Sequence, residues 1–105
     1  MNTFTQRGRG NLKGRDVSWP FASITVEPRL LTLNVFGIET FTPEEVNAVE
    51  PMGWLFFGRG VRIHYRKGKN TFPTYALFYT LVSAKPLIDA IAAAEFVIGK
   101  PKHWL

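Results

Sequence analysis

Positively charged side chains cluster in one short stretch of the sequence. Residues 59 to 69 include five cations and no acid, namely Arg59, Arg62, Arg66, Lys67 and Lys69. Arg62, His64 and Arg66 alternate with apolar residues, so in a strand they share one face. Such a patch can hold phosphates or acidic side chains. A charged strand face also protects a sheet from edge-to-edge aggregation, so a solvated face is the alternative to a binding site.

Residues that could act as catalysts are few. Only His64 and His103 are of the residue type that could act as a base at neutral pH, and no Asp or Glu stands close to His64 in the sequence to orient it. Glu44 and Glu45 are adjacent acids, an arrangement usual at the start of a helix, where they favour the dipole. We therefore expect no catalytic residue, no metal site, no cofactor and no enzyme. An enzyme would require His64 to meet a carboxylate from a distant strand.

Motifs for nucleotide and metal chemistry are also missing. The sequence has neither HExxH nor GxxxxGK[ST]. It has no cysteine, which excludes disulfides and every metal site built on thiolates. No apolar run approaches the length of a signal peptide or of a membrane span, so we expect a cytoplasmic protein with no transmembrane segment.

The first eighteen residues combine charge with glycine. They carry four cations, one acid and three glycines, the cations being Arg7, Arg9, Lys13 and Arg15. We expect a flexible basic arm over residues 1–18, because little in this segment can be buried. Such an arm can follow the phosphates of RNA or a membrane, or it can simply be a terminus kept soluble by its charge.

An aromatic run is the last candidate for a binding surface. Residues 54–57 read Trp-Leu-Phe-Phe, and four consecutive apolar side chains cannot all point inward from one strand. If Trp54 and Phe56 are exposed, they mark a partner surface. The alternative is that the N-terminal arm or the tail with Trp104 covers them.

Short apolar runs separated by turn residues indicate the elements that position these side chains. The 105 residues suffice for one domain, and 46% hydrophobic with 20% charged residues is a globular composition. Alternation and turn signals predict seven strands, near residues 21–27, 30–36, 39–41, 46–50, 54–57, 61–66 and 74–80. The first two should form a hairpin, and residues 42–45 a single helical turn with a capping box.

The period changes near the end of the chain. From residue 83 to about 96, apolar side chains recur at intervals of three and four, which predicts an amphipathic helix. Ser83 can cap this helix, and Pro86 is tolerated in its first turn. We therefore expect three parts, which are the arm at 1–18, a domain at 19–98 and a tail at 99–105.

This order of elements resembles the pleckstrin homology (PH) fold, and the local sequences resemble those of small bacterial PH-like domains. The similar segments read WPFASITVEPRLLTL, FTPEEVNAVEP, GRGVRIHY, PTYALFYT and KPLIDAIAAAEF, over residues 19 to 96. The resemblance implies a mainly β fold, a partly open barrel of about seven antiparallel strands closed by a C-terminal helix. It also implies a scaffold for binding lipids, peptides or protein domains. The chain departs from inositide-binding members because its first hairpin offers only Arg29. It departs from many eukaryotic members because its closing helix has no tryptophan.

Net charge completes the expectation about function. The formal charge of +5 favours anionic partners. We expect a noncatalytic binding or adaptor module that presents a basic strand face to an acidic protein or an anionic lipid surface. The alternative is a nucleic-acid-binding protein that uses the arm and the patch from Arg59 to Lys69.

Overall fold

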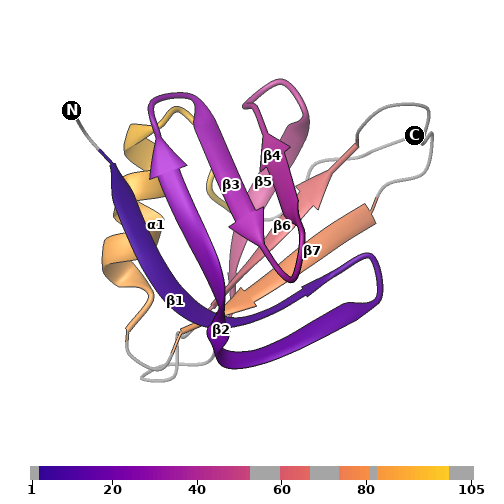
Figure 1. The fold of residues 1–105 in the computed structure, drawn as a ribbon. Coiled ribbons are helices and arrows are strands. Elements are labelled where there is room, and N and C mark those ends of the chain that lie inside the picture. The colour runs from indigo at the N-terminus through magenta and orange to yellow at the C-terminus, as the bar shows by residue number, and fades with distance from the viewer. Residues whose placement is uncertain (1–2, 53–59, 67–73, 81–82, 100–105) are drawn as a thin grey trace.

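The computed structural model describes residues 3–52, 60–66, 74–80 and 83–99. Its strands form one antiparallel sheet that curls into a half-barrel, accompanied by a short helix (Figure 1). The sheet order is β4-β3-β2-β1-β7-β6-β5. The elements are β1 (Phe4–Leu12), β2 (Arg15–Glu27), β3 (Leu30–Asn34), β4 (Ile38–Phe41), β5 (Val46–Met52), β6 (Gly60–Tyr65), β7 (Thr74–Tyr79) and α1 (Lys85–Ala93). The predicted mainly β, antiparallel fold is confirmed, and six of the seven predicted strands are present. The strand predicted at 54–57 lies outside the described residues, and β1 was not predicted.

The segment expected to be a flexible arm instead forms β1 and the beginning of β2. β1 lies at the centre of the sheet, between β2 and β7. Its buried positions are Gly8, Gly10 and Leu12, which alternate with exposed Arg7 and Arg9. Gly8 is needed here because β1 passes very close to the β7 backbone at this position. The alternation of arginine with glycine therefore marks a strand whose glycine side is tightly packed and whose arginine side is exposed.

β2 pairs with β3, as the predicted hairpin requires, and it also pairs with β1. Val26 lies opposite Leu31 and Ile24 opposite Leu33. In the first half of β2, the register of its pairing with β1 shifts between Gly8 and Gly10 of β1. The residues of β2 in this irregular stretch include Phe21, which is exposed. A bulge of this kind turns side chains away from their regular direction.

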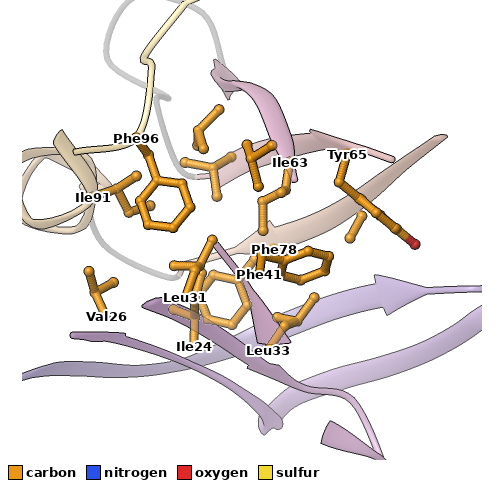
Figure 2. Packing of buried hydrophobic residues seen from close by; sticks show 14 of the residues in the cluster. Ile24, Val26, Leu31, Leu33, Phe41, Ile63, Tyr65, Phe78, Ile91 and Phe96 are labelled. Atoms are coloured by element: carbon orange, nitrogen blue, oxygen red, sulfur yellow. The ribbon is translucent and has the colours of Figure 1, made fainter. Parts of the chain in front are cut away.

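The core lies inside the curl of the sheet. Side chains from both halves of the sheet point toward one another, including Ile24 from β2, Phe41 from β4 and Phe78 from β7 (Figure 2). Ile91 of α1 and Phe96 after it close one end. Burial of each large apolar side chain favours folding by about 1.5–3 kcal/mol, so these contacts are what holds the curl.

α1 begins and ends inside the predicted limits. The N-cap residue is Ala84 and not the predicted Ser83, although the Lys85 backbone N–H donates to the Ser83 hydroxyl at 3.2 Å. A proline stands in the first turn as expected. The helix ends before Glu95, whose φ of 75° breaks the helical backbone. The chain then follows β5, where the Val49 N–H donates to the Val97 carbonyl at 2.7 Å. Residues after the helix thus pair with part of the edge of the sheet.

A network around Arg29 joins two turns to the end of α1. Arg29 donates to Glu95 at 2.9 Å and also to Glu44. In the turn at 42–45, the Glu45 carboxylate accepts from the Thr42 backbone N–H at 3.0 Å, which is one half of the predicted capping box. A hydrogen bond from its own backbone, together with the Arg29 guanidinium, holds the pKa of the Glu44 carboxyl below its ordinary value.

Replacing Arg29 with glutamine should raise the pKa of Glu44 toward its ordinary value, because a positive neighbour is lost while the backbone hydrogen bond stays. A lowered pKa contributes stability above the ordinary carboxyl pKa, and this contribution disappears as pH falls through the lowered value. The Arg29→Gln protein should therefore lose less stability over this acidic range than the parent. Carboxyl NMR titration measures the shift. Lys85→Gln is the control, because Lys85 pairs with Asp89. An unchanged Glu44 pKa in Arg29→Gln would contradict the network.

Candidate functional site

The structure places part of the predicted basic patch. Arg62 and His64 lie on β6 and are half-buried, and they alternate with buried Val61, Ile63 and Tyr65 as predicted. Arg66 follows the strand, and its backbone N–H donates to the Glu45 carbonyl at 2.9 Å. The remaining predicted site residues, Arg59, Lys67, Lys69 and Trp54, lie outside the described residues.

His64 does have an acidic partner, contrary to what its neighbours in the sequence indicated. Glu50 of β5 places Oε1 2.9 Å from His64 Nε2 and 3.6 Å from Arg62 Nη1. β5 and β6 are antiparallel, and their register sets Glu50 directly opposite Arg62. Sequence reasoning missed this acid because it is 14 residues from His64 and only strand pairing brings them together. One carboxylate thus offsets part of the positive charge on β6.

The Glu50–His64 pair lies on the outer surface of the sheet. The Tyr75 ring covers this cluster, with its centroid 6.0 Å from that of His64. A cavity of about 380 Å³ lies elsewhere, lined by residues that include Phe4, Val26 and Ala94. Neither member of the pair lines that cavity. Among the described residues, no three His, Cys, Asp or Glu side chains are grouped as metal ligands.

Arginines lie against the tyrosines of β7 from both neighbouring strands. Arg9 of β1 has its Cζ 5.7 Å from the centroid of Tyr79, and Arg62 of β6 has its Cζ 4.9 Å from that of Tyr75. Tyr75 remains 52% exposed. We call Arg9, Arg62, Tyr75 and Tyr79 the arginine–tyrosine face. The spacing of the two tyrosines, on the opposite side of β7 from Ala76 and Phe78, is the sequence signal that could have revealed it.

Further cations lie on β1, on β2 and in the turn between these strands. Arg9 pairs with Asp16 at 3.3 Å, and both side chains are more than half exposed, so this surface pair contributes little to stability. Lys13 lies 3.0 Å from Glu39, and this hydrogen bond raises the pKa of Lys13. Neither Arg7 nor Arg15 forms an ion pair with any described residue. These two guanidinium groups are therefore available to an anionic partner.

The arrangement suits recognition of anions. A guanidinium stacked on an aromatic ring keeps its edge free to donate hydrogen bonds. That edge matches the two oxygens of a carboxylate or a phosphate. Because the rings support the arginines before a partner arrives, less side-chain entropy is lost on binding.

No protein-family model, curated protein or solved structure matches this chain. Among the described residues, no helix has the length and apolar character needed to cross a bilayer. Function is therefore inferred from the residues of the arginine–tyrosine face and their surroundings.

Proposed function

We propose that the protein is a noncatalytic, PH-like binding module whose arginine–tyrosine face binds an acidic protein or an anionic membrane. The observation that carries this proposal is the placement of Arg9 and Arg62 over the rings of Tyr79 and Tyr75 on adjacent strands. Seven antiparallel strands followed by a helix support the PH-like assignment, because that order is the one the resemblance implies.

Electrostatics favours an anionic partner over a neutral one. The chain carries a formal charge of +5, which draws negatively charged surfaces toward it over distances near the Debye length. At contact, arginine is suited to leaving water for an interface because its guanidinium is weakly hydrated. The same residues thus serve both the approach and the final contact.

A structural role for Glu50 and His64 supports the noncatalytic assignment. Glu50 Oε1 is shared between His64 and Arg62, so the carboxylate links β5 to two positions on β6. Cross-strand pairs of this type stabilise sheets. Catalysis would also need a concave site around the pair to hold a substrate. The pair lies instead on the outer face of the sheet, where the Tyr75 ring is a neighbour of His64.

Replacing both Arg9 and Arg62 with glutamine should weaken binding to vesicles of phosphatidylcholine and phosphatidylserine. Each cation near an anionic surface contributes about 1 kcal/mol, so the pair should account for roughly a 25-fold loss of affinity. Cosedimentation with vesicles measures this, and binding to polyglutamate tests the protein-like partner.

The matched control removes two cations elsewhere, by Arg29→Gln and Lys85→Gln. These side chains belong to the β2–β3 turn and to α1, away from the arginine–tyrosine face. Circular dichroism should show that both double variants are folded. Equal losses in the two variants would mean that net charge alone acts, and this result would refute the assignment of the face.

Single-stranded nucleic acid is a second candidate, favoured by the exposed ring of Tyr75 beside Arg62. Bases stack on such rings, and arginines contact the phosphates. β1 now supplies Arg7 and Arg9 from an ordered strand, in place of the expected arm. Binding to oligothymidylate that is lost in Tyr75→Ala, while vesicle binding is absent, would favour this candidate.

A further inference from the structure

Four large apolar side chains are exposed in two segments, the irregular stretch of β2 and the turn that leads from β3 into β4. They are Phe36, 72% exposed, Ile38, 71%, Phe21, 65%, and Trp19, 49%. We call these residues the aromatic patch. They are four of the six large hydrophobic residues that are exposed in the described part of the chain. A concentration of this kind marks an interaction surface.

Strand register places the members of the patch toward one end of β2, β3 and β4. Ser23 lies opposite Asn34 across β2 and β3, and Asn34 lies opposite Ile38 across β3 and β4. Phe21 and Phe36 each lie two residues beyond this row, at the same end of the two strands. Paired strands are about 4.8 Å apart, so the side chains of this row are neighbours. Trp19 and Phe21 lie in the stretch of β2 where the pairing with β1 shifts register.

The backbone of the β3–β4 turn holds Phe36 away from the core. Phe36 has a φ of 51°, in the left-handed region that bulky residues rarely adopt. The preceding residue, Val35, is fully buried. The turn between β3 and β4 requires this backbone conformation, and it leaves the Phe36 ring on the outside of the sheet, where a partner can reach it.

Cations surround the aromatic patch. A Cβ placed on Gly37 would lie 3.1 Å from Arg15 Nη2, so this guanidinium stands directly beside the turn. Arg7 lies opposite Ser23 at the border of the patch. Neither arginine pairs with an acid among the described residues, whereas nearby Glu39 is already paired with Lys13. The border of the patch is therefore net positive.

We propose that the aromatic patch docks on an anionic membrane, with Phe36 and Ile38 entering the interface and Arg7 and Arg15 contacting the lipid phosphates. This inference rests on the proposed function and names the membrane as its partner. Aromatic rings favour the headgroup region, and lasting attachment needs an apolar contribution as well as charge. A second copy of this chain is a poor occupant because two positive borders would repel. Ile38 offers no ring on which a base could stack.

The first test replaces Phe36 and Ile38 with serine. Both side chains lose their burial in the lipid interface, so vesicle affinity should fall at least about a hundredfold. Both side chains are largely exposed, so folding should be unaffected, which circular dichroism checks. Binding to polyglutamate should stay unchanged, because it depends on the arginine–tyrosine face.

The second test detects insertion directly and uses the absence of native cysteine. Phe36→Cys carries a fluorophore that shifts to the blue in an apolar environment, and Ala92→Cys on the exposed side of α1 is the control. We expect a blue shift at position 36 with vesicles that contain phosphatidylserine. We expect none with pure phosphatidylcholine, and none at position 92 with either.

The outcomes separate this inference from the proposed function. Vesicle binding without a blue shift, and with unchanged affinity in the serine variant, would overturn membrane docking while the arginine–tyrosine face stands. Binding to polyglutamate or oligothymidylate alone would do the same. Failure to bind vesicles, polyglutamate and oligothymidylate would overturn both proposals.

Discussion

Gly8→Ala is expected to destabilise the protein by about 3 kcal/mol or more, at the upper end of the cost of overpacking. A Cβ at this position would lie 2.0 Å from the Tyr79 carbonyl oxygen and 2.7 Å from the Phe78 ring. The first clash is with backbone, which cannot rotate away, so β1 would have to separate from β7. Because these strands join the two halves of the sheet, the loss should be cooperative. Urea denaturation measures the free energy of unfolding.

Gly14→Asn is the matched control for this substitution. Gly14 has a φ of 82°, and a Cβ added there would have nothing within 4 Å. Asparagine accepts left-handed backbone better than most residues. The free energy of unfolding of this variant should therefore stay close to that of the parent. If the N-terminal segment were a flexible arm, Gly8→Ala would also leave stability unchanged, and that result would contradict the central place of β1.

Phe78→Ala should cost about 3–5 kcal/mol, the usual range for removing a buried aromatic ring. Phe78 is fully buried, and it lies opposite Val61 on β6 and Gly10 on β1. Its ring lies in the core between the two halves of the sheet (Figure 2). Removal leaves a cavity that rigid strands on both sides cannot fill.

The same chemical change on the surface is the control for Phe78→Ala. Phe36→Ala removes a ring that is 72% exposed, so its effect should be within about 0.5 kcal/mol. Thermal or urea unfolding of the two variants gives the comparison. A Phe78→Ala protein as stable as Phe36→Ala would show that the core is not centred on β7.

Local patterns were enough to predict much of the fold. The alternation in β2 and β3 indicated two paired strands, and the structure pairs Ile24 with Leu33. Intervals of three and four indicated α1, although the positive φ at Glu95 ended it sooner. β1 was missed because two of its inward positions are glycines and not large apolar residues. Gly8 is required by the close approach of β7, a strand that is far from β1 in the sequence.

The candidate site was less accessible to sequence reasoning. Arg62 and His64 were recognised by their shared face, whereas Glu50 and Arg9 join them only through strand register. The exposure of Phe36 depends on one backbone angle in a turn, which no periodicity predicts. Long-range pairing is set by the whole fold, so the partners of a surface residue are the last feature that a local pattern can indicate.

The domain carries two neighbouring surfaces, one that would bind a partner through charge and one that would bind through apolar contact. The arginine–tyrosine face offers supported guanidinium groups, and the aromatic patch offers apolar side chains bordered by cations. Phe21 and Arg9 lie near the boundary between them. Charge would draw the protein toward a negative surface, and apolar insertion would then slow its release.

Salt dependence tests the arginine–tyrosine face most directly. The measurement compares the full chain with the Arg9→Gln/Arg62→Gln variant on phosphatidylserine-containing vesicles across a salt series. The Debye length falls from about 30 Å at 0.01 M to about 10 Å at 0.1 M, so affinity of the full chain should fall steeply. We predict that the variant binds more weakly at low salt and responds less to added salt. Equal affinities and equal salt responses in the two proteins would contradict the account.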